Sequence, residues 1–281
     1  MSGAAGAASD MECRPRACAG VRRRVMLTVA YDGTDYSGYA LQKTSPKPTI
    51  EGEINHAIHA LTGETVQVIG ASRTDAGVHA LGNVAVFDTA SPIPAENMAH
   101  ALNPLLPRQI RIIAAREVRS DFHPRHTKTL KTYEYHILNA PYDIPTMSRY
   151  THRVPWPLDV ARMQEGAEYL VGEHDFTSFC NVQTQSENHV RNIEKILMKK
   201  QLLADMNDAE GPSLIVLQIT GNGFLYNMVR IIAGTLIQVG ARRREVGDVA
   251  AMLDARDRSA AGPTAPPEGL ILKKIIFEEL S

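Results

Sequence analysis

The stretch ASRTDAGVHALGNVAVFDT, residues 71–89, joins a tight turn to a strand. Asp75 lies between the cation of Arg73 and a small Ala-Gly step, and His79 follows shortly after. A surface turn accounts for the Asp-x-Gly part on its own. It does not account for the flanks at 65–69 and 83–88, whose apolar residues predict buried strands on both sides. The rest of the chain must explain why an acid and an arginine meet there.

The composition is typical of a soluble globular protein. The chain has 281 residues, of which 44% are hydrophobic and 22% are charged, and this length can bury a large core in one or two domains. No apolar run reaches the roughly 18 to 20 residues that a membrane span needs. Residues 1–24 contain no secretory signal and are expected to form a disordered extension. Because Cys13, Cys18 and Cys180 make no metal or disulfide pattern, a cytoplasmic location is expected.

The formal net charge of −1 gives no general sign of a nucleic-acid binder. The basic residues are clustered, however, at 22–24, 125–131, 199–200 and 242–244. Each cluster alone is what a solvated surface often shows. Together they are compatible with a folded basic groove.

Hydrophobic periodicity predicts an α+β fold. Strands are expected at 25–31, 65–69, 83–88, 111–118, 132–138, 190–198, 213–220 and 270–277. Helices are expected from about Thr49 and at 158–171, 224–239 and 246–256. Because strict strand-helix-strand alternation is scarce, we expect a mostly antiparallel or mixed sheet, with helices on one face and a cleft on the other. A polar boundary near 119–128 divides the chain into halves at 25–121 and 122–281.

Two further segments carry side chains that packing alone does not explain. Lys131 precedes a strand that has Tyr133 and Tyr135 on one face. Within 220–240, Arg230 falls off the apolar stripe of the predicted helix, beside small residues that let another backbone approach. An arginine there could reach an acid on a facing loop.

Each of these residues also has a purely structural explanation. Asp75 could be a turn residue and His79 a structural hydrogen bonder. The two tyrosines could be half-buried strand residues with solvated hydroxyls. Arg230 could extend along the helix surface to reach water.

Six segments in order along the chain resemble the tRNA pseudouridine synthase A family. The segments are YDGTDYSGY (31–39), SRTDAGVHA (72–80), FHPRHTKTLKTYEYHI (122–137), GEHDFTSF (172–179), GNGFLYNMVRIIAGTLIQVG (221–240) and TAPPEGLIL (264–272). They extend over nearly the whole chain after residue 24, at spacings similar to those of the family. This ordered match outweighs the separate structural explanations.

The resemblance implies a pseudouridine synthase fold built from two ferredoxin/RRM-like halves. It implies an isomerase that converts uridine to pseudouridine in the anticodon stem-loop of tRNA, at nucleotides 38–40 in the usual tRNA numbering. It further implies that the enzyme needs no cofactor or metal and works as a homodimer, with one tRNA contacting both subunits.

The resemblance also assigns roles to individual residues. Asp75 matches the essential aspartate, Tyr133 the tyrosine that packs against the target base, and Arg230 the basic partner of the aspartate. Arg73 matches an arginine implicated in displacing the base from the helix. The residues expected to bind RNA or substrate are Arg73, His79, Arg125 and Lys131.

The chemistry requires an ionised carboxylate, whether Asp75 attacks the ring, attacks the sugar or removes a sugar proton. The sequence leaves these three routes open. A nearby Arg230 is expected to lower the pKa of Asp75 by roughly 1–3 units against the effect of burial, and to hold it bidentately. The base must leave its stack at a cost of a few kcal/mol, so a dry pocket with a flat wall at Tyr133 is expected.

The chain departs from the family pattern at two places. Tyr39-Ala40 stands where a Trp-Gln pair is common, and Ser72 stands where glycine is usual. Neither departure touches the matched Asp75, Tyr133 or Arg230, but both bear on substrate choice. The alternatives are therefore a paralogue that modifies another RNA site and a non-catalytic RNA-binding protein on the same fold; a protein–protein module is the weakest.

Overall fold

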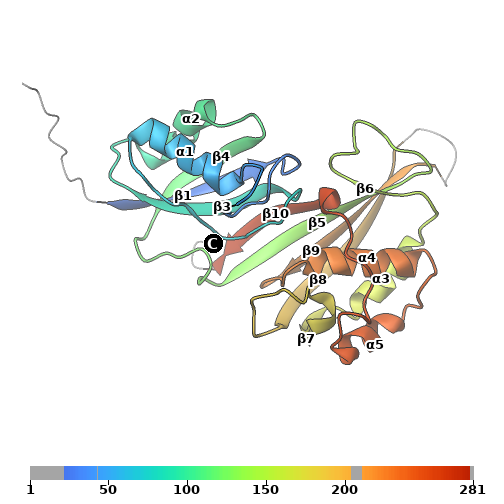
Figure 1. Ribbon diagram of the computed structural model, residues 1–281. Coiled ribbons are helices and arrows are strands. Elements are labelled where there is room, and N and C mark those ends of the chain that lie inside the picture. The colour runs from blue at the N-terminus through green and yellow to red at the C-terminus, as the bar shows by residue number, and fades with distance from the viewer. Residues whose placement is uncertain (1–21, 43, 204–210, 279–281) are drawn as a thin grey trace, which may run out of the picture.

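One mixed β-sheet runs through both halves of the molecule (Figure 1). The structure is a computed structural model that describes residues 22–42, 44–203 and 211–278. Its strands are β1 (Arg23–Tyr31), β2 (Ile69–Gly70), β3 (His79–Thr89), β4 (Ile110–Val118), β5 (Thr129–Asn139), β6 (His152–Val154), β7 (Gly172–Asp175), β8 (Val190–Leu202), β9 (Ser213–Gly221) and β10 (Leu270–Phe277).

The sheet follows the order β4-β1-β3-β10-β5-β9-β8-β7, with β2 beside β3 and β6 beside β5. Most neighbouring strands are antiparallel. The parallel pairs are β3 with β10 and β5 with β6. This mostly antiparallel, mixed sheet confirms the predicted α+β class.

Strand β10 joins the two halves of the sheet. Leu272 pairs with Ala80 of β3 on one side and with Tyr133 of β5 on the other. The last described strand of the chain therefore lies in the middle of the sheet, between the strands that follow Asp75 and carry Tyr133. The predicted division between 121 and 122 stays a prediction, because both halves share this one sheet.

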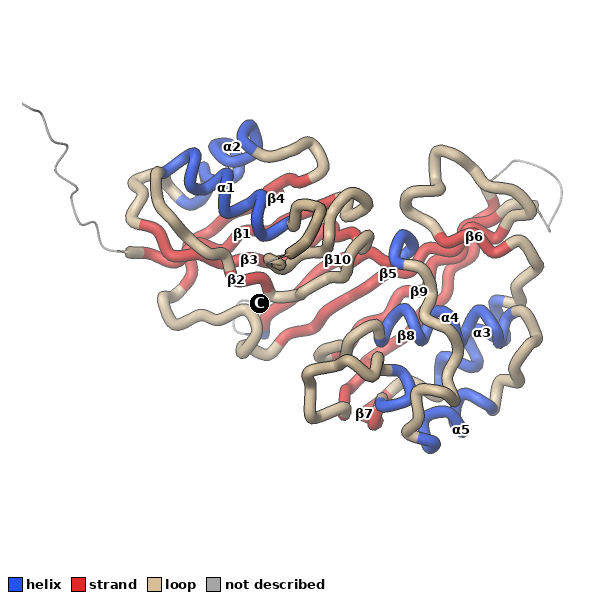
Figure 2. The backbone as a smooth tube through the Cα atoms, in the orientation of Figure 1, coloured by secondary structure: helices blue, strands red, loops and turns tan. Residues whose placement is uncertain are grey.

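Helices cover one face of the sheet, in two groups (Figures 1 and 2). The α-helices are α1 (Ile50–Thr62), α2 (Met98–Leu102), α3 (Val160–Glu168), α4 (Met228–Gly240) and α5 (Asp248–Ala255). Short 3-10 turns are η1 (Ala95–Asn97), η2 (Asn103–Leu105), η3 (Thr177–Phe179) and η4 (Pro267–Gly269). Figure 2 shows α1 and α2 over the N-terminal half and α3, α4 and α5 over the C-terminal half.

Strand register places both helical groups on the same side. Tyr31 pairs with Ala80, Ala80 with Leu272, and Leu272 with Tyr133. Directly paired residues point to the same face of a sheet. These side chains belong to one buried cluster with the apolar faces of α1 and α4. The main core therefore lies between this face and the helices.

Helix α1 shows how local sequence fixes these elements. The Thr49 side chain accepts a hydrogen bond from the Gly52 N–H at its start, and Gly63 ends it in a left-handed conformation with φ 73°. Ile50, Ile54 and Ile58 recur at helical spacing and are fully buried. Burial of each such side chain contributes about 1.5–3 kcal/mol.

Most predicted elements are present, with shifted ends. The predicted strand at 65–69 is wrong except for Ile69, because β2 contains only Ile69 and Gly70. The predicted helix at 224–239 begins at Met228, because Asn227 has a left-handed φ of 62° that helical residues do not adopt. The short elements α2, β6 and β7 were not predicted.

The N-terminal boundary also differs slightly. Residues 1–21 of the predicted 1–24 extension lie outside the described residues. Arg23 and Arg24 belong to β1, and the Arg24 guanidinium donates to both Asp88 carboxylate oxygens at 2.7 Å. Within the described ranges, no helix is long and apolar enough to cross a membrane.

Gly234 tests the packing of α4 against the loop that follows α5. A Cβ atom at Gly234 would lie 1.9 Å from the Pro263 carbonyl oxygen. We expect Gly234→Ala to lower the free energy of unfolding by about 1–3 kcal/mol in urea titrations, because backbone must move. Gly247→Ala is the matched control, since nothing lies within 4 Å of its Cβ position and its φ is −66°. Equal stability of the two variants would contradict this packing.

Candidate active site

A pocket of about 880 Å³ opens where the two halves meet. Residues from 37–46 and 71–78 line it from the N-terminal half, and β5 and residues 224–229 line it from the C-terminal half. Tyr133, which points to the helical side, is part of its wall. We expected the cleft on the face opposite the helices, and this placement is wrong. Each helical group covers its own half of the sheet, and the pocket lies between the two groups.

Asp75 begins a tight turn at the floor of this pocket. The Val78 N–H donates to the Asp75 carbonyl at 3.2 Å, and Gly77 has a φ of 79°, which L side chains rarely adopt. Gly38 lies so close that an added Cβ would be 2.7 Å from the Thr74 carbonyl oxygen. The Asp-x-Gly sequence therefore forms a turn, as the purely structural explanation expects. The same turn also places the Asp75 side chain in the pocket lining.

The loop before Asp75 is anchored by both halves of the protein. Lys131 Nζ donates to the Ala71 carbonyl at 2.9 Å, and the Ser72 and Tyr133 hydroxyls are 2.7 Å apart. The Thr74 hydroxyl is 2.7 Å from the buried Tyr31 hydroxyl. Ser72, where the family usually has glycine, therefore bonds directly to the tyrosine of the pocket. This contact was not predicted, although the departure at Ser72 marked the position.

Arg230 is the basic group in contact with Asp75. Its Nη1 lies 3.4 Å from Asp75 Oδ2, and 15% of the Arg230 side chain and 27% of the Asp75 side chain are exposed. Burial raises the pKa of Asp75 above its ordinary value, and Arg230 opposes this with the smaller effect. The predicted pairing is present and Arg230 lowers the pKa of Asp75 as expected, but burial has the larger effect, so the net shift is upward.

The expected bidentate geometry is wrong, because the Arg230 guanidinium is shared. Its Nε donates to the Ala265 carbonyl at 2.7 Å, and Nη1 donates to Asn227 Oδ1 at 2.9 Å. Sequence reasoning missed both acceptors. Asparagine directly before a helix is a local signal for a left-handed or capping residue, whereas no sequence pattern indicates that Ala265 is near.

Tyr133 forms an aromatic wall together with Phe224. Their ring centroids are 5.2 Å apart at 84°, an edge-to-face arrangement. Tyr133 is buried, and burial raises the pKa of its hydroxyl to about 12. The hydroxyl therefore stays protonated at neutral pH and hydrogen-bonded to Ser72. Phe224 was not predicted as a site residue, although it lies in the matched segment 221–240.

The predicted cations differ in their exposure. Arg73 and Arg125 are exposed and line the pocket. Lys131 lines it too but is partly buried, and burial, with a smaller effect of Arg191, lowers the pKa of its ammonium to about 8. All three therefore place basic groups along the pocket wall.

His79 does not line the pocket. Its side chain is buried, its Nδ1 accepts from the Gly33 N–H at 3.1 Å, and its ring packs edge-to-face against Tyr150 at 5.1 Å. Burial is the main effect that lowers the pKa of His79. Other groups cover the ring in this geometry, which fits the structural explanation, and the expected RNA contact of His79 stays a prediction.

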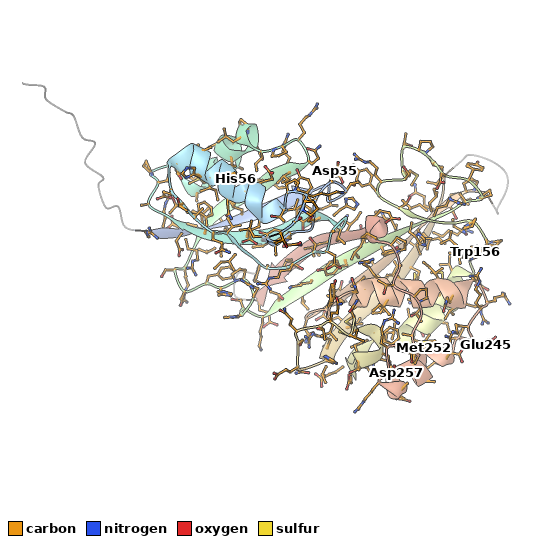
Figure 3. All side chains as sticks on the ribbon, in the orientation of Figure 1. Asp35, His56, Trp156, Glu245, Met252 and Asp257 are labelled. Atoms are coloured by element: carbon orange, nitrogen blue, oxygen red, sulfur yellow. The ribbon has the colours of Figure 1, made fainter. Side chains whose placement is uncertain are left out.

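His79 instead belongs to a contact between the two halves. The Tyr150 hydroxyl donates to Asp32 at 2.9 Å, and Arg149 donates to Asp35 at 3.1 Å. Figure 3 shows Asp35 at the edge of the N-terminal half that faces the C-terminal half. Because these partners lie more than 100 residues apart in the chain, no local pattern predicts their contact.

The described ranges contain no group of three or more His, Cys, Asp or Glu side chains suited to a metal ion. Cys180 is a buried free thiol. The expectation that the chemistry needs neither metal nor cofactor stays a prediction.

Comparison with known proteins gives one consistent result. The sequence model of the tRNA pseudouridine synthase family matches residues 27–126 and 167–278. The chain is 42% identical to tRNA pseudouridine synthase A of Thermoanaerobacter sp. (strain X514) and 44% identical to that of Brevibacillus brevis, over 91% of this chain and 100% of each relative. It is 44% identical to tRNA pseudouridine synthase A 2 of Clostridium tetani, over 91% of this chain and 99% of the relative.

The raised pKa of Asp75 has a consequence for stability. Because the folded state binds this proton more tightly than the unfolded chain, the contribution of Asp75 to stability is fully present below its ordinary pKa of 3.8 and is lost as pH rises through the folded value. We expect Asp75→Asn to raise the urea midpoint at pH 7, and the gain to shrink as pH falls toward 4.

Asp88→Asn is the control with the opposite sign. Arg24 lowers the pKa of Asp88, so this carboxylate stabilises the fold above its ordinary pKa and loses that effect as pH falls. We expect Asp88→Asn to lower the midpoint at pH 7 and to approach wild type in acid. The same sign for both variants at pH 7 would contradict the assignment for Asp75.

Proposed function

This chain belongs to the tRNA pseudouridine synthase family, and from that membership we propose that it isomerises uridine to pseudouridine in the anticodon stem-loop of tRNA, at nucleotides 38–40. The observation that carries the proposal is the position of Asp75. This partly buried carboxylate lies 3.4 Å from Arg230, in a pocket whose wall contains Tyr133 and Phe224.

The proposed reaction rearranges one nucleotide without adding or removing atoms overall. The N1–C1′ bond breaks, the uracil ring turns within the pocket, and a C5–C1′ bond forms. The hydrogen at C5 is then lost as a proton, and N1 gains one. Asp75 serves as the ionised group, through attack on the ring, attack on the sugar or removal of a sugar proton. All three routes need its charge, which Arg230 favours and burial opposes.

The aromatic wall supports the steps before and after bond cleavage. A uridine in a stem cannot be reached in its stack, and everting it costs a few kcal/mol. Tyr133 offers a ring against which the everted base can pack, and Phe224 holds that ring from the side. The Ser72 hydroxyl fixes the phenol end. We propose that this wall retains the detached uracil while it turns.

Arg73 and Arg125 supply the positive charge at the pocket. Both side chains are exposed and line the same pocket as Asp75. We propose that Arg73 occupies the position that the everted base vacates and that Arg125 contacts phosphate. Lys131 donates to the Ala71 carbonyl, so it anchors the proposed catalytic loop and also adds positive charge to the pocket wall.

We further propose that the enzyme is a cytoplasmic homodimer and that one tRNA contacts both subunits. The family resemblance supports the dimer, and a tRNA substrate supports the location. Neither a metal nor a cofactor is part of the proposed chemistry. Light scattering of the purified chain tests the dimer directly.

Loss of the charge at position 75 should abolish turnover. With tRNA that carries tritium at C5 of uridine, we expect wild-type protein to release tritium, and Asp75→Asn and Asp75→Ala to release none above background. Both variants should keep tRNA affinity within about threefold, since one partly buried side chain contributes little to phosphate-dominated binding.

Asp88→Asn is the matched control for this assay, because Asp88 lies outside the pocket lining, and it should release tritium at the wild-type rate. Equal tRNA binding with no release from wild type would instead favour a non-catalytic RNA-binding protein. Release that requires another RNA, with none from tRNA, would favour a paralogue with a different substrate.

The pocket arginines should carry salt-dependent binding. Removal of one phosphate contact lowers the slope of log affinity against log salt by about one. We expect Arg125→Ala to show this change in filter-binding titrations from low to moderate salt. Arg256→Ala, at the C-terminal end of α5, is the control and should leave the slope unchanged. An unchanged slope in Arg125→Ala would remove Arg125 from the RNA contact.

A further inference from the structure

The contact between Arg230 and Asp75 is longer than an unconstrained ion pair. Its Nη1–Oδ2 distance is 3.4 Å, whereas charge-assisted N–H···O bonds are typically about 2.7–2.9 Å. The same chain contains a pair at that shorter distance: Arg24 donates twice to Asp88, at 2.7 Å each. The Arg230 pair is therefore longer than the Arg24–Asp88 pair and equal in length to the Arg23–Glu117 and Arg256–Asp175 pairs, which are also 3.4 Å. What distinguishes Arg230 is that other acceptors hold its guanidinium.

Two neutral acceptors hold the Arg230 guanidinium. Its Nε donates to the Ala265 carbonyl at 2.7 Å, and the Ala265 N–H donates back to the Arg230 carbonyl at 3.1 Å. Its Nη1 donates to Asn227 Oδ1 at 2.9 Å. Both bonds are shorter than the bond from Nη1 to Asp75, so the guanidinium is positioned by these neutral oxygens more than by the carboxylate.

Asn227 has an unusual backbone conformation. Its φ is 62°, a left-handed value that is uncommon for a residue with a side chain. It precedes α4 as the N-cap residue, yet its side chain makes no capping hydrogen bond. The amide turns back to Arg230 instead. Strained conformations of this kind gather at functional sites because the surrounding structure must maintain them.

We infer that Asn227 is a positioning residue that, together with the Ala265 carbonyl, holds the Arg230 guanidinium back from Asp75 so that the ion pair stays open. This inference rests on the proposed function of the same pocket. In the described part of the chain, Asp75 Oδ1 accepts no hydrogen bond, and Oδ2 accepts only the long one from Arg230. A closed bidentate pair would occupy both oxygens and lower the reactivity of the carboxylate toward the nucleotide.

Other charged or titratable groups face the same pocket without contacting the Asp75 carboxylate. Arg73 lies on its own loop, Lys131 and Tyr133 lie on β5, and Arg125 lies on the segment before β5. Besides burial, Arg230 is the group that shifts the pKa of Asp75. A change in how Arg230 is held should therefore be measurable at Asp75.

The test replaces Asn227 and measures the titration of Asp75 directly. Asn227→Gly keeps the left-handed backbone without strain and removes the whole side chain, including the amide oxygen that accepts from Arg230. In carboxyl ¹³C NMR of aspartate-labelled protein, with the signal of Asp75 identified by its loss in Asp75→Asn, we expect the Asp75 midpoint to fall by about 0.5–1 pH unit because the pair closes. Tritium release should show kcat lowered by about three- to tenfold, with KM changed less than about twofold.

Asn227→Asp gives the opposite shift. Its carboxylate should draw the guanidinium away and repel Asp75, so the Asp75 midpoint should rise. Arg256→Gly is the matched control: Arg256 also has a left-handed φ, of 48°, at the end of α5. This variant should leave the Asp75 midpoint unchanged. An unchanged or raised midpoint in Asn227→Gly, or an unchanged midpoint in Asn227→Asp, would overturn the inference.

The NMR titration does not depend on turnover. If the midpoints shift as expected while wild type releases no tritium, the positioning role stands and the proposed isomerase activity fails. If wild type releases tritium and the midpoints do not shift, the activity stands and the role of Asn227 is overturned.

Discussion

The central position of β10 is the constraint on which the pocket depends. Through Leu272 this strand pairs with both Ala80 and Tyr133, so it fixes the distance and register between the strand after Asp75 and the strand that carries the aromatic wall. The hydrogen bond from Lys131 to the Ala71 carbonyl and the one between the Ser72 and Tyr133 hydroxyls then attach the Asp75 loop to β5. The helices of the two halves never need to meet over this seam. The pocket is thus a consequence of how the sheet is joined.

Within that pocket, the electrostatic balance differs from a simple ion pair. Burial raises the pKa of Asp75 and Arg230 offsets only part of the rise. In a tight pair such as Asp88 with Arg24, both carboxylate oxygens accept short hydrogen bonds. Such a carboxylate is well stabilised but has no oxygen left to react. Among the described residues, Asp75 instead has no hydrogen-bond donor on Oδ1 and one long contact, from Arg230, on Oδ2. If the free site already stabilised this charge fully, less additional stabilisation would remain for the transition state.

The sequence predicted the fold class, most strands, α1 and the meeting of Asp75 with Arg230, because alternation, capping and an ordered family match all act locally or along the chain. It could not predict features that depend on tertiary context. The cleft opens on the helical side because register through Leu272 orients Tyr133. His79 is buried by Tyr150 from a distant loop. The length of the Arg230 contact depends on acceptors at Asn227 and Ala265.

Because β10 comes after every other described strand in the chain, the ribosome makes the centre of the sheet late. Domains often fold from the N-terminus during synthesis, but here β3 and β5 cannot be joined until residues 270–277 have left the exit tunnel. Up to that point, the two facing strands expose unpaired backbone edges. Until then Asp75, Arg230 and Tyr133 are not held together, so the pocket is completed by the last of the described strands.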